Sequence, residues 1–159
     1  MRIPFNKPLY LTKYDRYIQK NLIKTNHYSS NGYFSKKCEK LINKLLRVNH
    51  SILTKSCTSA LEMCALLIDI QPGDEIIMPS YTFVSTANAF VMRGGVPVFA
   101  DIDKNDFNID VNQIEKKITK KTKAIVIVHY AGFGCKIDQI KKITKKHNLY
   151  LIEDAAQGF

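Results

Sequence analysis

The run Ala124-Ile125-Val126-Ile127-Val128 decides the fold class of this chain of 159 residues. Five consecutive apolar residues are typical of a strand that is buried on both faces. Such strands belong to parallel sheets whose two faces are covered by helices. The run therefore predicts an α/β protein.

The segments on either side of this run alternate between strand and helix. Strands are indicated at Ser51–Thr54, Glu75–Met78, Val96–Ala100 and Leu149–Ile152. Helices are indicated at 34–48, 59–70, 82–92, 110–118 and around Ile137–Ile143, where apolar residues recur at helical spacing. This alternation favours βαβ units. We therefore predict three layers with a mostly parallel sheet, formed by an α/β core over 34–159 that follows an N-terminal segment, 1–33.

Helix ends can be predicted at three places. Ser59-Ala60-Leu61-Glu62 has the pattern of a capping box, which predicts a helix start at Ser59. Asp110 is suited to cap the helix that follows it. Arg93-Gly94-Gly95 is suited to close the helix over 82–92.

Composition narrows the class of protein. No apolar run reaches the roughly 18 residues that a membrane span needs. The N-terminus, Met1 to Asn6, has no apolar stretch resembling a signal peptide, so the expected location is the cytoplasm. The net charge of +10 raises the alternative of a nucleic-acid-binding module. The lysines are spread over the polar faces of several helices without interleaved aromatic residues, which favours solvated faces and no nucleic-acid partner.

The four cysteines do not form a metal site. Cys38, Cys57, Cys64 and Cys135 make no CxxC pair and have no histidine at zinc-ligand spacing. We expect reduced thiols that are mostly buried, with Cys57 as the exception because it lies in a candidate phosphate loop.

Open α/β sheets bind ligands at the carboxyl ends of their strands, and several polar or aromatic groups are predicted there. Ser56-Cys57-Thr58-Ser59 could bind a phosphate at a helix N-terminus or could be a plain helix cap. Asp154 could be a ligand group or the cap of a following helix. Tyr81 and Phe83 could stack on a flat ligand or pack in the core. His129 could be a hydrogen-bonded structural residue or an acid–base group.

Taken in their order, these groups resemble the DegT/DnrJ family of sugar aminotransferases, which have the aspartate-aminotransferase-like fold (PLP-dependent transferase type I). The motifs that carry the resemblance span essentially the whole chain: Ile3-Pro4-Phe5-Asn6, Ser56-Cys57-Thr58, Gly73-Asp74-Glu75, Pro79 to Asn88, His129-Tyr130-Ala131-Gly132 and Glu153 to Gln157. Within the family, the run from Leu66 to Phe90 looks nearly the same as in members that act on dTDP-4-dehydro-6-deoxy-D-glucose for the enterobacterial common antigen.

The resemblance implies pyridoxal 5'-phosphate as the cofactor and gives roles to individual residues. Asp154 would pair with the pyridine nitrogen, which keeps that nitrogen protonated. Gln157 would hydrogen-bond the ring oxygen, and Phe83 would stack on the ring face. Cys57 and Thr58 would bind the phosphate.

The resemblance also implies a substrate side of the site and a reaction. Gly32, Tyr33 and Phe34, together with His129, would lie where the sugar substrate approaches. The reaction would transfer an amino group from an amino acid, expected to be glutamate, to a nucleotide-linked 4-keto-6-deoxy sugar in the synthesis of cell-surface polysaccharide. Family members act as homodimers.

One feature of the family has no counterpart in the sequence. The family's catalytic lysine lies well downstream of the Glu153-Asp154-Ala155-Ala156 motif, and Lys55 and Lys136 match no such position. We therefore expect no catalytic residue in this chain, which would be the N-terminal part (1–159) of the large domain, without the C-terminal half and the small domain. By itself it would be inactive. The alternatives are a truncated, non-catalytic remnant and a relative in which histidine replaces the lysine, which would be a sugar dehydratase.

Overall fold

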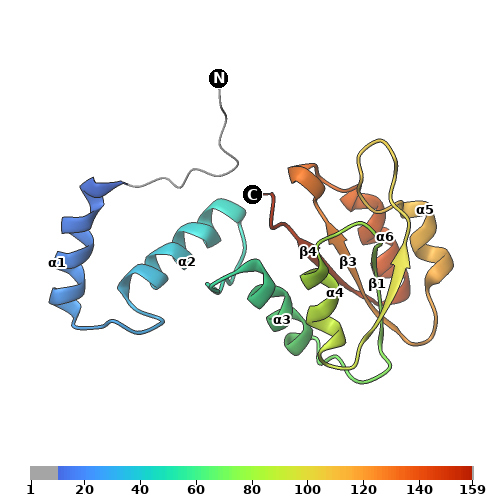
Figure 1. Cartoon of the computed structure of the whole chain (residues 1–159), viewed down its shortest axis with the longest axis horizontal. Coiled ribbons are helices and arrows are strands. Elements are labelled where there is room, and N and C mark those ends of the chain that lie inside the picture. The colour runs from blue at the N-terminus through green and yellow to red at the C-terminus, as the bar shows by residue number, and fades with distance from the viewer. Residues whose placement is uncertain (1–10, 159) are drawn as a thin grey trace. The chain divides into compact units, whose positions relative to one another are not determined.

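The computed structural model describes residues 11–158, which form two compact units that divide between Leu53 and Thr54. The first unit contains a 3-10 turn, Thr12–Tyr14, followed by helix α1, Asp15–Thr25, and helix α2, Tyr33–Leu46 (Figure 1). Helix α2 confirms the helix predicted over 34–48, whereas α1 was not predicted. The motif Ile3-Pro4-Phe5-Asn6 lies outside the described residues.

The second unit contains a sheet of four parallel strands in the order β2-β1-β3-β4. The strands are β1, Glu75–Pro79, β2, Val96–Ala100, β3, Thr122–Val128, and β4, Tyr150–Asp154. Strand β3, which contains the apolar run, lies between β1 and β4, and Val126 pairs with Ile152. The parallel sheet is confirmed, and the proline-containing strand β2 lies at an edge of it.

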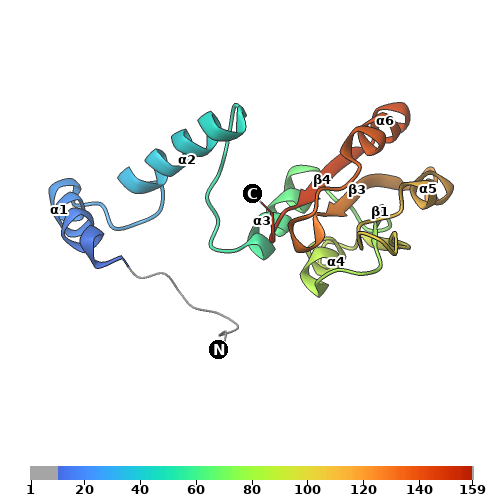
Figure 2. The same ribbon diagram turned by 90° about the horizontal axis from the view of Figure 1, so that it is seen from above.

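Helices cover both faces of this sheet (Figures 1 and 2). Their bounds are α3, Cys57–Leu67, α4, Val84–Val91, α5, Val111–Ile114, and α6, Ile137–His147, with 3-10 turns at Glu115–Lys117 and Tyr130–Gly132. Ile76 and Met78 of β1 belong to a core with α3 and α4, whereas Ile77 belongs to a core with α5 and α6. Alternate residues of one strand therefore face two separate cores, which confirms the three-layer architecture.

Two local predictions are wrong. Ser51–Thr54 is not a strand; it has no partner strand among residues 11–158, and Ile52 is 64% exposed. Helix α3 begins at Cys57 rather than at Ser59. The reason is that Ser56 has an extended backbone and its Oγ accepts the Ser59 N–H at 3.1 Å, so Ser56 is the N-cap.

The predicted burial of the cysteines is only partly correct. Cys135 is buried, Cys57 and Cys64 are half-buried, and Cys38 is exposed because α2 buries none of its residues. The described cysteines form no disulfide, and residues 11–158 contain no group of side chains that could hold a metal ion. Within the same part of the chain, no helix combines the length and apolar character that crossing a bilayer requires.

Candidate functional site

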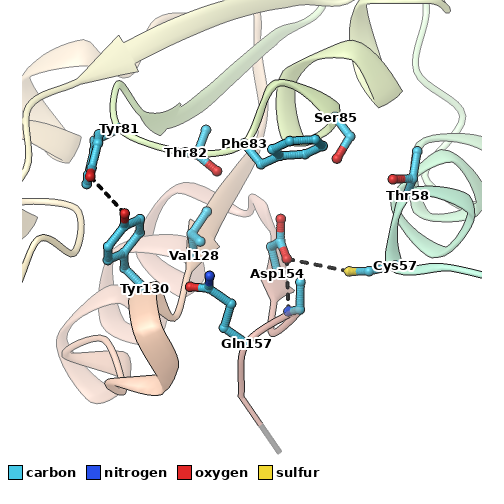
Figure 3. A pocket seen from close by; sticks show the side chains of 11 residues that line it. Cys57, Thr58, Tyr81, Thr82, Phe83, Ser85, Val128, Tyr130, Asp154 and Gln157 are labelled. Carbon is cyan, nitrogen blue, oxygen red and sulfur yellow. Dashed lines mark hydrogen bonds between the residues drawn. The ribbon is translucent and has the colours of Figure 1, made fainter. Parts of the chain in front are cut away.

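A pocket of about 400 Å³ lies at the carboxyl end of the sheet, in the second unit (Figure 3). Its lining comes from the start of α3, the loop between β1 and α4 with the first turn of α4, and the ends of β3 and β4 with the residues that follow them. The lining residues are Cys57, Thr58, Tyr81, Thr82, Phe83, Ser85, Val128, Tyr130, Asp154, Ala156 and Gln157. The pocket thus brings together all five residues that the sequence predicts as cofactor ligands.

The carboxylate of Asp154, the last residue of β4, is buried in the pocket with an exposed fraction of 5%. Its Oδ2 accepts a hydrogen bond from the Thr86 hydroxyl at 2.8 Å. Its Oδ1 accepts from the Ala156 N–H at 3.1 Å and from the Cys57 thiol at 3.5 Å. All three donors are neutral, and no basic side chain of residues 11–158 forms an ion pair with this carboxylate. A buried charge without a counter-charge favours a cationic group on a ligand.

The Cys57 thiol is a donor rather than a nucleophile in this arrangement. Burial raises the pKa of Cys57, and the negative charge of Asp154 and the hydrogen bond donated to it raise that pKa further. The thiol therefore stays protonated at neutral pH.

The N-terminus of α3 lines the same pocket. The Ser59 N–H is bound by Ser56 Oγ, and the Ala60 N–H by Ser56 O. Within the described part of the chain, the N–H groups of Cys57 and Thr58 have no acceptor, as is usual for a first helical turn. Two open N–H groups and the positive end of an eleven-residue helix suit an anionic group such as a phosphate.

Two aromatic side chains in the β1–α4 loop are not packed in the core. Phe83, the N-cap residue of α4, is 74% exposed, and Tyr81 is 47% exposed. Figure 3 shows the Phe83 ring on the side of the pocket opposite Gln157, above the Asp154 carboxylate in that view. Their exposure argues against core packing and leaves an apolar ring face for a flat ligand.

Tyr130, which follows β3, donates a hydrogen bond of 2.8 Å to the Tyr81 hydroxyl across the pocket wall. This bond raises the pKa of Tyr130. The two rings lie 4.7 Å apart, centroid to centroid, and Phe107 contacts both. These rings form an aromatic rim beside the pocket.

Gln157 is held in one orientation. Its Oε1 accepts the Ala131 N–H at 2.7 Å, and Ala131 has a left-handed backbone (φ 51°) that presents this N–H. Since Oε1 is occupied, Nε2 is the end of the amide that can donate to a ligand oxygen.

His129 does not line the pocket. Its Nδ1 accepts the Cys135 N–H at 3.1 Å, so the proton lies on Nε2, which donates to Glu153 at 3.0 Å. Both ring nitrogens therefore have partners within the chain, and a role in substrate binding stays a prediction. The same holds for Gly32, Tyr33 and Phe34, which belong to the first unit, at the start of α2.

No lysine is among the residues that line the pocket, and the ammonium group of Lys136 pairs with Asp103 at 3.1 Å. Sequence reasoning did not identify Thr82, Thr86, Ser85, Val128 or Ala156 as parts of the site. The only signal was their place in motifs quoted for the family or at the end of a predicted strand.

The fold and the pocket define an α/β protein whose pocket, at the carboxyl end of a parallel sheet, combines open N–H groups at a helix N-terminus with a buried carboxylate. Residues 13–159 match the family model of the DegT/DnrJ/EryC1/StrS aminotransferases, and the chain belongs to that family. The family depends on pyridoxal phosphate.

Individual relatives agree with this membership. GDP-perosamine synthase of Escherichia coli O157:H7 is 36% identical over 157 residues, which are 99% of this chain and 43% of that protein. An aminotransferase from Psychrobacter cryohalolentis matches with a TM-score of 0.89 and 32% identity, covering 98% of this chain and 40% of its own. NtdA from Bacillus subtilis, solved with its bound cofactor PMP, has a TM-score of 0.87 and 34% identity, covering 93% of this chain and 34% of its own. The chain spans less than half the length of the curated relatives it matches.

Proposed function

We propose that this chain forms the cofactor-binding part of a pyridoxal-phosphate-dependent sugar aminotransferase. The observation that carries the proposal is the buried Asp154 carboxylate, which has only neutral donors around it within the described residues. A protonated pyridine nitrogen is a cationic donor of the kind this carboxylate lacks. The open N–H groups of Cys57 and Thr58 supply the complementary site for a phosphate at another part of the same pocket.

The residues present therefore fit pyridoxal phosphate. Asp154 would hold the ring nitrogen, Phe83 the ring face, and Gln157 would donate through Nε2 to the ring oxygen. Cys57 and Thr58 would hold the phosphate. When bound, the cofactor supplies an electron sink that assists removal of the α-proton from an amino donor. The contribution of these side chains is to orient the ring and to keep a negative charge at its nitrogen.

The substrate we propose is a nucleotide-linked 4-keto-6-deoxy sugar, used for cell-surface polysaccharide, with glutamate as amino donor. Membership of the family and the similarity to GDP-perosamine synthases support this class. We propose dTDP as the nucleotide, because the run from Leu66 to Phe90 resembles that of family members that act on a dTDP-linked sugar. Gly32, Tyr33, Phe34 and His129 are proposed to contribute on the substrate side. The active form is proposed to be a homodimer in the cytoplasm.

The test of the cofactor site is a binding measurement with two ligands. Pyridoxal phosphate and an analogue whose ring nitrogen is replaced by C–H are titrated against the chain, and the ratio of the two dissociation constants is taken. We expect the chain to prefer pyridoxal phosphate, and we expect Asp154→Asn to weaken its binding roughly ten- to a hundredfold, because a hydrogen bond to a charged group is lost.

Asp138→Asn is the matched control, since Asp138 is an exposed aspartate of α6, away from the pocket lining. It should bind both ligands as the unmodified chain does. No preference for pyridoxal phosphate in the unmodified chain, or an unchanged preference in Asp154→Asn, would remove the assignment of Asp154.

A further inference from the structure

Thr86 is a fully buried polar residue in the first turn of α4, with an exposed fraction of 0%. A threonine in a helix commonly bonds a backbone carbonyl three or four residues earlier. The Thr86 hydroxyl instead reaches from the helix to the sheet, where it donates to Asp154 Oδ2 at 2.8 Å. Its other contact is with the Thr82 hydroxyl, also at 2.8 Å. Thr86 does not line the pocket, whereas both of its partners do.

Which group donates each of these two hydrogen bonds follows from the single proton that a hydroxyl carries. A carboxylate can only accept, so the single hydroxyl proton of Thr86 goes to Asp154. The bond between the two threonines must then be donated by Thr82. The order is Thr82 to Thr86 to Asp154, and each hydroxyl that donates is polarised by the one before it.

The two oxygens of Asp154 are held unequally. Oδ1 has two donors, the Ala156 N–H and the Cys57 thiol. Within the described residues, Oδ2 has only the Thr86 hydroxyl. Loss of that hydroxyl would leave Oδ2 without this donor, so that the carboxylate would be held through Oδ1 alone.

We infer that Thr86 is a positioning residue for Asp154. It acts through the carboxylate, holding it in the orientation in which the charge faces the ligand's cationic group. The inference rests on the proposed function, because it names the residue that sets the geometry of the same site. It predicts that the preference for a ligand with a ring nitrogen depends on a hydroxyl that never touches the ligand.

The experiment compares Thr86→Val, which keeps the shape of the side chain and removes the hydroxyl, with Thr86→Ser, which keeps the hydroxyl. The readout is the ratio of dissociation constants for the nitrogen-lacking analogue and for pyridoxal phosphate. We expect Thr86→Val to reduce this ratio roughly two- to tenfold and Thr86→Ser to restore it, since one hydrogen bond to the carboxylate is at stake.

Thr144→Val is the matched control, because Thr144 is also a buried threonine, and its hydroxyl donates to the Lys141 carbonyl of its own helix, α6. It should leave the ratio unchanged. If Thr86→Val does not fold, as judged by circular dichroism, Thr86→Ala replaces it as the variant without a hydroxyl.

The outcomes separate this inference from the function on which it rests. If the unmodified chain shows no preference for pyridoxal phosphate, the proposed function is wrong and the inference falls with it. If the chain shows the preference and Thr86→Val keeps it, with both ligands weakened equally, Thr86 is only structural and the inference alone is overturned. A reduced ratio that Thr86→Ser restores supports it.

Discussion

Residues of the same type differ in reactivity along this chain, and the cysteines show this most clearly. Burial raises the pKa of Cys64 and of Cys135, the latter to about 11. The pKa of Cys57 is raised by burial and also by the negative charge of Asp154. Cys38 is exposed on α2. Because the thiolate is the reactive form, both pKa and exposure set the rate of alkylation.

We predict that iodoacetamide modifies Cys38 first and Cys135 last. In Asp154→Asn, alkylation of Cys57 should become severalfold faster, because removing the neighbouring charge lowers the pKa of that thiol. Mass spectrometry of digested samples over time measures both rates. Cys64 is the internal control, since burial alone raises its pKa. If Asp154→Asn speeds alkylation of Cys64 as much as that of Cys57, the substitution has exposed buried side chains in general, and the prediction is contradicted.

The location of pocket residues such as Asp154 and Thr58 could be predicted from the sequence. Asp154 ends a strand and Thr58 lies at the start of a helix, and such positions along the chain lie at the carboxyl edge of a parallel sheet. Thr86 could not be predicted in this way. Its role depends on a contact across 68 residues of sequence, between the first turn of α4 and the end of β4. Side-chain contacts of this kind follow from packing between elements, which periodicity does not report.

The elements are joined by turns whose geometry depends on particular glycines, above all between α4 and β2. Gly94 has a left-handed backbone (φ 84°), and the Gly95 N–H donates to the Phe90 carbonyl at 3.0 Å. A Cβ on Gly95 would lie 2.7 Å from Ile76 Cδ1 and 3.0 Å from Phe90 O. The turn therefore packs directly against the core beneath α4.

We predict that Gly95→Ala destabilises the protein by roughly 1–3 kcal/mol, the usual cost of overfilling a packed core. Urea denaturation followed by circular dichroism gives this free energy of unfolding. Gly134→Ala is the matched control, because a Cβ there meets nothing within 4 Å. If Gly95→Ala lowers the free energy of unfolding no more than Gly134→Ala does, the close packing of Gly95 is contradicted.

Most elements of the second unit could be predicted because the spacing of apolar residues in each sequence segment matches the faces that the helix or strand buries. The apolar run of β3 is buried on both faces, and the apolar residues of α6 recur at helical spacing. Ser51–Thr54 was mistaken for a strand because short apolar runs look alike whether or not a partner strand exists. The start of α3 was misplaced by two residues, since two serines compete as caps and only backbone geometry selects Ser56.

Across the whole molecule, a few carboxylates are held ionised by neighbours that link distant segments. Asp74 accepts the Gln71 N–H at 2.9 Å and pairs with Lys123 of β3 at 3.0 Å, and these contacts lower its pKa. Hydrogen bonds and ion pairs also lower the pKa of Asp103 and of Glu115. With a net charge of +10, each carboxylate lost to protonation adds to self-repulsion.

We predict that stability is lost in acid. A carboxyl with a lowered folded-state pKa stabilises the fold above its ordinary pKa, which is 3.8 for Asp74, and this contribution disappears as pH falls through the folded value. Melting temperatures measured from about pH 6 to pH 3 should therefore fall steeply below about pH 4. Asp74→Asn should lower the melting temperature at pH 6 and flatten the curve, whereas Asp138→Asn should not. Parallel curves for Asp74→Asn and the unmodified chain would disprove the role of Asp74.

The hydrogen bond between Cys57 and Asp154 joins groups 97 residues apart, and this separation bears on the order of folding. The start of α3 is synthesised early, but its carboxylate partner arrives only with β4. Until β4 pairs with β3, the pocket lacks the Asp154 carboxylate. A ligand that needs Asp154 would therefore bind only after β4 has paired with β3, and by mass action it would hold β4 in place. Protection of β4 amides against hydrogen exchange would then report ligand capture.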